Sequence, residues 1–169
     1  RDWSGRMVNI STVNVLAENN RFLQGHGVSI GSETSGWVRN ITIRNSHLDG
    51  TNLAVRIKTM RGRGGGVEDV VYENMEGSTK SAIQLTLNYG SAAPTNASAT
   101  PEMRRITLRN LTIHSGSYLD CDGLDDSIID DITFDDVTVT GGSGETCKYC
   151  KINAAHTSPK PKCSSASNV

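Results

Sequence analysis

Apolar and polar residues alternate in five short segments that resemble one another along the chain. These segments are residues 15–19, 41–45, 70–74, 106–110 and 132–136. Alternation with a period of two is the pattern of a half-buried β-strand, and the Val, Ile, Thr, Tyr and Phe at these positions fit a pleated surface. In three of the repeats a second alternating segment follows, at residues 27–30, 54–57 and 82–85. The sequence therefore predicts an all-β protein with two strands in several of its repeats.

Successive repeats begin 26, 29, 36 and 26 residues apart, counted between Val15, Ile41, Val70, Ile106 and Ile132. A period in this range with strand character predicts a solenoid of stacked parallel strands, a right-handed parallel β-helix. An asparagine stands at the same point of four repeats, where we expect it to end the strand, adopt a left-handed backbone and bond to its neighbours as a ladder. These are Asn19, Asn45, Asn74 and Asn110. An antiparallel sandwich with coincidental Asn turns is the alternative, and four Asn in register argue against it.

We expect the β-helix coils to occupy residues 1–145 and a cysteine-containing tail to occupy residues 146–169. The chain begins at Arg1 rather than Met and shows no signal peptide, which indicates that the natural N-terminus has been removed or was never included. The helix would then be partial. An uncovered coil edge is an aggregation liability, so we expect missing N-terminal coils or another chain to cover it.

Composition narrows the function classes. The chain has 17 Gly, few aromatic residues and a formal charge of −1. It has no apolar run long enough to span a membrane, so no membrane partner is expected. Near-neutral charge with few aromatics argues against a nucleic-acid platform. The glycine-rich residues 61–66 lack the Lys-Ser/Thr of a phosphate loop, and no cofactor is indicated.

The four cysteines gather toward the C-terminal end, at Cys121, Cys147, Cys150 and Cys163. An even number permits three disulfide pairings, and the sequence does not choose among them. Zinc is the alternative, with Cys147, Cys150, His156 and Cys163 as ligands. Disulfides are favoured and no metal site is expected, because this segment has almost no apolar residues to fold around a metal.

Four acceptor sequons for N-glycosylation begin at Asn9, Asn40, Asn96 and Asn110. Each is weak alone, because Asn at strand ends and Thr in strands produce sequons by chance. Together with the cysteines they predict a secreted, extracellular glycoprotein.

An imidazole and two cations form the candidate site. His26 lies between Gly25 and Gly27, whose lack of side chains lets a substrate or a carboxylate come close. Arg56 and Lys58 occupy outward positions of a predicted strand, and Ser29, Arg56 and Gln84 should stack on one outer face. Such a face suits an acidic polymer, since Arg offers a planar fork and Lys a compact cation. The alternative is that both are ordinary surface cations.

These residues carry a resemblance to a known family. Gly-His-Gly-Val-Ser-Ile-Gly-Ser-Glu at residues 25–33, Ala-Val-Arg-Ile-Lys-Thr at 54–59 and Gly-Arg-Gly-Gly at 62–65 resemble the polygalacturonases of glycoside hydrolase family 28. The resemblance implies a secreted parallel β-helix that hydrolyses α-1,4-galacturonosyl links of polygalacturonate, in pectin of the cell wall, with inversion. It implies that His26 supports catalysis, that Arg56 and Lys58 hold the galacturonate carboxylate, and that Tyr89 stacks on substrate.

The chain departs from the family in one respect. The family's catalytic aspartates lie in Asn-Thr-Asp and Asp-Asp motifs before the Gly-His-Gly coil, and neither motif stands before residue 25. Loss of both proton-transfer partners predicts that the chain as given is inactive alone. Two classes stay open: the C-terminal part of a polygalacturonase, or a non-catalytic β-helical module that binds glycan or serves structurally outside the cell. Exo or endo action and the particular pectic substrate also stay open.

Overall fold

The alternating segments form strands, and strands that lie side by side in space are one coil apart in sequence. The computed structural model describes residues 2–90 and 99–164. Its elements are α1 (Asp2–Val8), β1 (Thr12–Glu18), β2 (Arg21–Phe22), β3 (Val28–Gly31), β4 (Val38–Lys58), β5 (Gly66–Thr86), β6 (Glu102–Asp122), β7 (Ile129–Thr140), β8 (Glu145–Lys148) and β9 (Cys150–Ala155).

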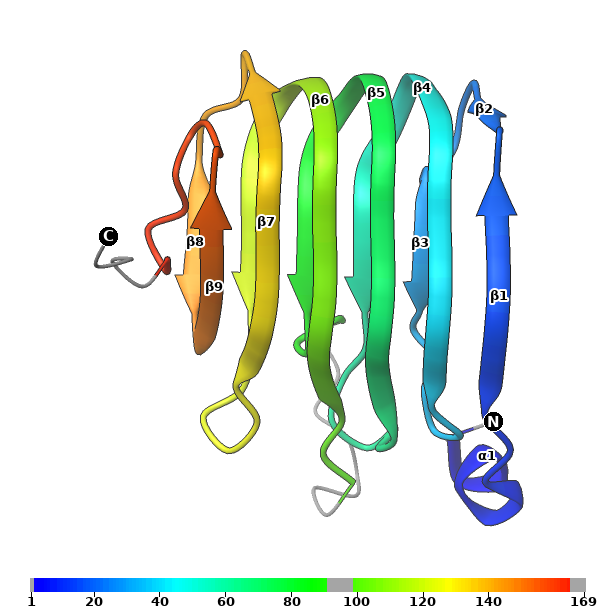
Figure 1. Cartoon of the computed structure of the whole chain (residues 1–169). Coiled ribbons are helices and arrows are strands. Elements are labelled where there is room, and N and C mark those ends of the chain that lie inside the picture. Colours follow the sequence, from blue (N-terminus) through cyan, green and yellow to red (C-terminus); the bar gives the residue numbers. More distant parts are fainter. Residues whose placement is uncertain (1, 91–98, 165–169) are drawn as a thin grey trace.

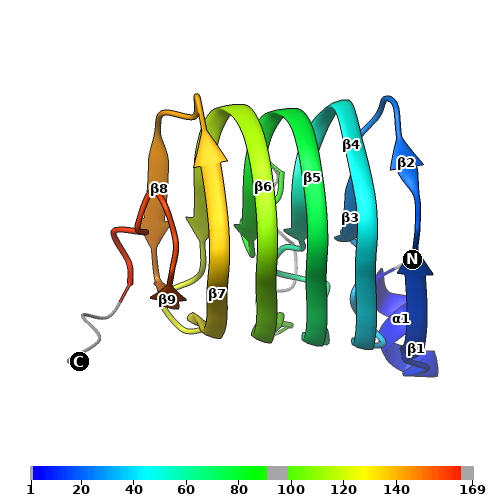
Figure 2. The same ribbon diagram turned by 45° about the horizontal axis from the view of Figure 1, so that its top comes forward.

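Every pair of neighbouring named strands in the described part is parallel. The main order is β1-β4-β5-β6-β7-β9, with β2 and β3 pairing to β4 and β8 pairing to β6. Each of the long strands β4, β5 and β6 runs up one side of the molecule, bends over and descends on the other side (Figures 1 and 2). The protein is a right-handed parallel β-helix, as predicted, and the antiparallel alternative is wrong.

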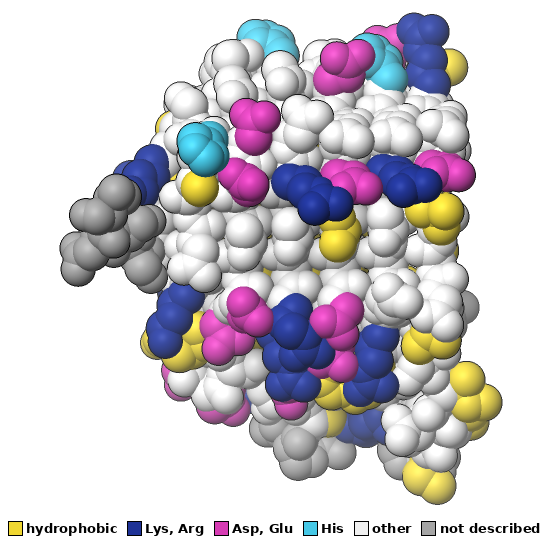
Figure 3. Space-filling model, in the orientation of Figure 1, with side chains coloured by type: hydrophobic (Ala, Val, Ile, Leu, Met, Phe, Trp, Pro, Cys, Tyr) yellow, Lys and Arg dark blue, Asp and Glu magenta, His cyan; other side chains and the backbone are white. Residues whose placement is uncertain are grey.

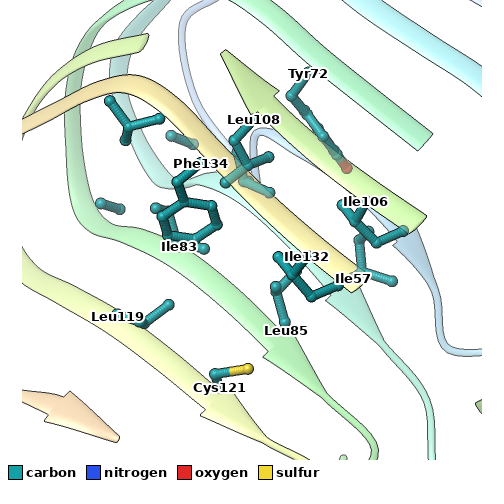
Figure 4. Packing of buried hydrophobic residues seen from close by; sticks show 14 of the residues in the cluster. Ile57, Tyr72, Ile83, Leu85, Ile106, Leu108, Leu119, Cys121, Ile132 and Phe134 are labelled. Carbon is teal, nitrogen blue, oxygen red and sulfur yellow. The ribbon is translucent and has the colours of Figure 1, made fainter. Parts of the chain in front are cut away.

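Inward side chains of successive coils stack in columns that form the core. Tyr72 is in register with Leu108, and Leu108 is in register with Phe134. All three are fully buried, and Figure 4 shows them lying close together between the two layers of strands. Full burial of side chains of this size contributes about 1.5–3 kcal/mol each, so the in-facing positions of each coil hold the stack together.

Three members of the asparagine column turn the chain without ending the strands. Asn45, Asn74 and Asn110 have φ of 52°, 52° and 51°, and amide hydrogen bonds of 3.0 and 2.8 Å link Asn74 to Asn45 and Asn110 to Asn74. The prediction of a left-handed ladder is confirmed for these three. The prediction that the asparagines end strands is wrong for these three, because β4, β5 and β6 continue through them and pairing resumes on the next residue. It is confirmed for Asn19, which has φ of 57° and follows the last residue of β1.

A second column of left-handed residues, which the sequence analysis does not predict, lies five residues before the first column in each coil. Its members are Asn14, Asn40, Asp69, Arg105 and Asp131, with φ between 53° and 60°. Only its first two members are asparagines, joined by a hydrogen bond of 2.7 Å from Asn40 Nδ2 to Asn14 Oδ1.

Charged residues of alternating sign run across the coils on one outer face. This charge row consists of Glu18, Arg44, Glu73, Arg109 and Asp135, each in register with the next. Arg44 Nη2 lies 2.7 Å from Glu18 Oε2, and Arg109 Nε donates to Glu73 Oε2 at 2.6 Å. Figure 3 shows the row as alternating dark blue and magenta side chains. In-register parallel pairing thus places opposite charges side by side.

Two disulfides close the C-terminal end of the described stack. Cys121 is joined to Cys150, and Cys147 to Cys163. The disulfide prediction is confirmed, and the thiolates that the zinc alternative needs are absent. Part of the range 146–169 belongs to β8 and β9, which pair with β6 and β7; the boundary at residue 145 stays a prediction.

The first coil is open on its outer side. Among the described residues β1 pairs with β4 alone. Its apolar side chains are unusually accessible: Leu16 is 53% exposed, and Val13 and Val15 are also exposed. The positions in register with Val15 in the next two coils are Ile41 and Val70, which are buried. No helix in the described part is both long and apolar enough to cross a membrane.

Candidate functional site

The outward positions of β3, β4, β5 and β6 form a polar column. Ser29 is in register with Arg56, Arg56 with Gln84, and Gln84 with Asp120. The predicted stacking of the first three is confirmed. We call these four residues the Arg56 column. They lie on the descending parts of the strands, which end in the rear layer in Figure 1.

Hydrogen bonds hold the Arg56 column together. Arg56 Nε donates to Gln84 Oε1 at 2.8 Å, and Gln84 Nε2 donates to Asp120 Oδ2 at 3.0 Å. Arg56 is only 9% exposed, so it does not stand free in solvent like an ordinary surface cation. Its guanidinium is fixed from one side by an amide that is itself fixed by a carboxylate.

Lys58 and Tyr89 lie beside Arg56. The Lys58 ammonium nitrogen is 4.0 Å from the centroid of the Tyr89 ring, and Arg56 Cζ is 5.4 Å from it. The Tyr89 backbone N–H donates to the carbonyl of Thr59 at 2.9 Å, which places the ring just beyond the end of β4. The hydrogen bond with Lys58 and the charges of Lys58 and Arg56 lower the pKa of the Tyr89 phenol. Three of the predicted site residues therefore meet in one cluster.

His26 lies in the turn before β3. Its Nδ1 is 3.3 Å from Asn52 Nδ2 on the next coil. Gly27 is required here, because it has φ of 64° and an added Cβ would lie 1.9 Å from the carbonyl oxygen of Leu53. The imidazole is exposed, and among the described residues it makes no recorded contact with Arg56, Lys58 or Tyr89.

Ion pairs of Arg61 and Arg63 hold the glycine-rich loop of residues 61–66, which follows β4. Arg61 binds both Asp125 and Asp126, with Nη2 3.0 Å from Asp125 Oδ1 and Nη1 2.8 Å from Asp126 Oδ2. The hydrogen bond from Arg61 lowers the pKa of the Asp126 carboxyl. Arg63 reaches Glu33 at 3.3 Å. The loop thus connects the coil of β3 to the loop after β6.

A shallow groove of about 390 Å³ runs along the Arg56 column. It is lined by Leu53, Arg56, Gln84, Asp120, Glu145 and Thr146, among others. A larger hollow of about 550 Å³ follows the asparagine ladder, but it is lined by none of the predicted His26, Arg56, Lys58 or Tyr89. Of these four residues only Arg56 lines the smaller groove, together with Gln84 and Asp120 of its column.

The other predicted residues are dispersed. Asn9, Asn40 and Asn110 are exposed, the last two donating their amides to Asn14 and Asn74; Asn96 lies outside the described residues. Glycosylation stays a prediction. Three side chains of metal-ligating type meet in the described part only at Glu145, Cys147 and Cys163, where both sulfurs are in a disulfide.

Sequence analysis missed Asp120 and Asn52. The signal for Asp120 was present, since residues 118–121 repeat the in-and-out pattern of residues 82–85 with Asp at the outward position. It was hidden by the 36-residue spacing of that repeat. Asn52 gave no signal, because its place opposite His26 depends on the pairing of the turn with the next coil.

Comparison with known proteins agrees with this geometry. A polygalacturonase of Ralstonia nicotianae is 41% identical over 69 residues, covering 38% of this chain and 13% of the relative. A probable endopolygalacturonase D of Aspergillus oryzae is 32% identical over 136 residues, covering 74% of this chain and 27% of the relative. The chain thus spans a third or less of the length of these relatives.

The crystal structure of a hyperthermoactive exopolygalacturonase from Thermotoga maritima superimposes with a TM-score of 0.80 at 24% identity, covering 93% of this chain and 36% of that one. This likeness shows that the two share a fold. The family model for glycosyl hydrolases family 28 matches residues 7–161. The match spans nearly the whole sequence, and the chain therefore belongs to family 28 of the glycosyl hydrolases.

Proposed function

We propose that this chain is the C-terminal part of a secreted polygalacturonase-like hydrolase of pectin, and that it supplies the part of the site that binds a galacturonate carboxylate. The observation that carries the proposal is the convergence of Arg56, Lys58 and Tyr89 within one cluster. Two cations and an aromatic ring are the groups that a uronate needs: charge-assisted donors for its carboxylate and an apolar face for its sugar ring.

Each residue has a distinct role in this proposal. Arg56 presents a planar fork to the carboxylate, and Lys58 adds a compact charge from the same strand. Tyr89 covers both cations and offers its ring to the sugar. His26, with Nδ1 facing Asn52, supports the substrate and the acid group near the scissile link rather than acting as the primary acid.

We place the proton-transfer carboxylates on a coil that stacks on β1. The exposure of Val15 on β1, at a position that Ile41 and Val70 occupy as buried residues in later coils, supports this arrangement, since a further coil would bury it. Such a site would hydrolyse α-1,4-galacturonosyl links with inversion, one carboxyl group acting as acid and another activating water. The chain as given would then bind the substrate without cleaving it.

The two disulfides support a secreted, extracellular setting, because disulfides form and persist in oxidising compartments. Glycosylation at the exposed sequon of Asn9 is compatible with this setting.

A non-catalytic glycan-binding module is the second candidate. One observation favours it: the acid of the Arg56 column, Asp120, accepts a hydrogen bond from Gln84, so it serves the column that holds the binding arginine. This candidate shares the binding chemistry but needs no further carboxylates.

The test has two parts. Trigalacturonate binding is measured by calorimetry with the wild type, with Arg56→Ala and with Arg21→Ala, whose exposed guanidinium pairs with Asp49 far from Tyr89. Binding that is lost in Arg56→Ala and kept in Arg21→Ala supports the proposal; equal loss in both, or no binding, overturns it. A reducing-end assay on polygalacturonate with a longer protein that carries a coil before β1 then separates the candidates, since only the hydrolase releases reducing ends.

A further inference from the structure

We propose that Gln84 and Asp120 are positioning residues that set the rotation of the Arg56 guanidinium, so that a ligand carboxylate meets its two terminal nitrogens end-on. The inference rests on the proposed function, in which Arg56 binds the ligand. It concerns two residues of the following coils, which need not touch the ligand themselves.

The order of donors and acceptors along the Arg56 column fixes the orientation of the Gln84 side-chain amide. A carboxylate accepts hydrogen bonds and donates none, so Asp120 requires the NH₂ group of Gln84 on its side. The carbonyl oxygen of Gln84 must then face the other way, toward Arg56 Nε. An unanchored glutamine presents either group, and an NH₂ facing the guanidinium would repel its N–H donors. Asp120 therefore acts on Arg56 through Gln84.

The hydrogen bond from Arg56 Nε to Gln84 determines which edge of the guanidinium remains available to a ligand. A carboxylate binds arginine with two parallel hydrogen bonds, either side-on with Nε and one terminal nitrogen or end-on with both terminal nitrogens. Gln84 occupies Nε at 2.8 Å, which blocks the side-on mode. The Tyr89 ring lies 5.4 Å from Cζ, and the side chain is buried. The end-on mode, through both terminal nitrogens, remains.

A neutral residue between the arginine and the acid has a second consequence. If the residue in contact with Arg56 were itself acidic, it would pair with the guanidinium and compete with the ligand carboxylate. Gln84 instead transmits the orienting effect of Asp120 and leaves the charge of Arg56 unpaired by its neighbour. Gln84→Glu is therefore expected to strengthen the contact with Arg56 and yet weaken ligand binding.

Nuclear magnetic resonance of the arginine Nε–H groups tests the orientation directly in the ligand-free chain. The wild type is expected to show a resolved Arg56 Nε–H signal protected from solvent exchange, assigned by its loss in Arg56→Lys. The signal should lose its protection in Gln84→Leu and in Asp120→Ala. Asp136→Asn, which removes an exposed acid elsewhere, should leave it unchanged. Protection that survives Gln84→Leu overturns the inference.

Calorimetric titration with trigalacturonate measures the consequence for binding. Affinity is expected to fall about tenfold in Gln84→Leu, the effect of one hydrogen bond to a charged group. It should also fall in Gln84→Glu although the Nε–H signal there stays protected. Unchanged affinity in both variants, with thermal unfolding like the wild type, overturns the positioning role. If the wild type binds no trigalacturonate, the proposed function fails, and the part of the inference that concerns the ligand fails with it. The protection of the Arg56 Nε–H signal still decides whether Gln84 orients Arg56.

Discussion

Replacement of Glu68 by glutamine removes one negative charge from beneath three arginines on the outer face of the first coils. The side chain of Glu68 is 8% exposed. Its oxygens lie 2.6 Å from Arg39 Nε, 2.9 Å from Arg104 Nε and 2.9 Å from Arg105 Nη2. The substitution keeps the size and shape of the side chain but replaces one of the two acceptor oxygens with an NH₂ donor, so the result measures the lost charge together with one lost acceptor.

The expected loss of stability in Glu68→Gln follows from the burial of Glu68 and the solvent screening of its arginine partners. A hydrogen bond to a charged group contributes about 1.5–3 kcal/mol to stability. The three arginine side chains are 36–41% exposed, and solvent screening reduces the contribution of each. We expect a loss of about 2 kcal/mol, which for a chain of this size corresponds to roughly 4–8 °C in Tm.

The loss should depend on pH. Burial raises the pKa of the Glu68 carboxyl, and the hydrogen bonds and charges of Arg39, Arg104 and Arg105 outweigh it, so the pKa in the folded protein is lowered. A group with a lowered pKa stabilises the fold above its unfolded pKa, about 4.3 for Glu, and loses this contribution as the pH falls through the folded pKa. Wild type and variant should differ in Tm at pH 7 and converge in acid.

Thermal unfolding followed by circular dichroism measures both effects, at pH 7 and at several values below pH 4. Glu76→Gln on the same strand is the matched control, since Glu76 is 75% exposed and lies 3.6 Å from the His47 imidazole rather than beside an arginine; its Tm should change by no more than about 2 °C. Equal Tm values for the two variants at pH 7, or a Glu68 effect that is as large in acid, would refute the reasoning.

Three further changes have expected outcomes. Paired serine replacement of Cys147 and Cys163, 16 residues apart, should lower the free energy of unfolding by about 3 kcal/mol in urea denaturation; no change in midpoint would show that the tail adds nothing to the stack. Phe134→Ala in the fully buried core should lower it by about 3–5 kcal/mol, and Phe134→Leu by clearly less. Gly27→Ala, whose Cβ meets a backbone oxygen at 1.9 Å, should displace the turn that holds His26 and shift its imidazole resonances, whereas a wild-type spectrum would contradict the strain argument.

The sequence predicts the fold because the solenoid repeats one local rule. Apolar residues at alternate positions must face one side of a strand, and their recurrence at each coil leaves stacking as the arrangement that buries them. The same rule predicts that Ser29, Arg56 and Gln84 share an outer face. The structure has these three residues in register, so alternation alone was enough to predict this part of the candidate site.

What the sequence does not predict depends on contacts between coils. The second left-handed column includes Arg105 and Asp69; an arginine is not a residue type that signals a positive φ. The burial of Arg56 and its bond to Gln84 depend on side-chain packing. The disulfide pairing does not follow from strand register, because Cys121 and Cys147 are register neighbours and yet bond to Cys150 and Cys163.

The charge row of Glu18, Arg44, Glu73, Arg109 and Asp135 restricts how the chain could lengthen by duplication of its own coils. Its sign alternates from one coil to the next. A single duplicated coil would place arginine beside arginine or acid beside acid, and like charges directly opposite are destabilising. A duplicated pair of coils preserves the alternation. On this face, therefore, the smallest unit that can be inserted without a like-charge contact is two coils rather than one.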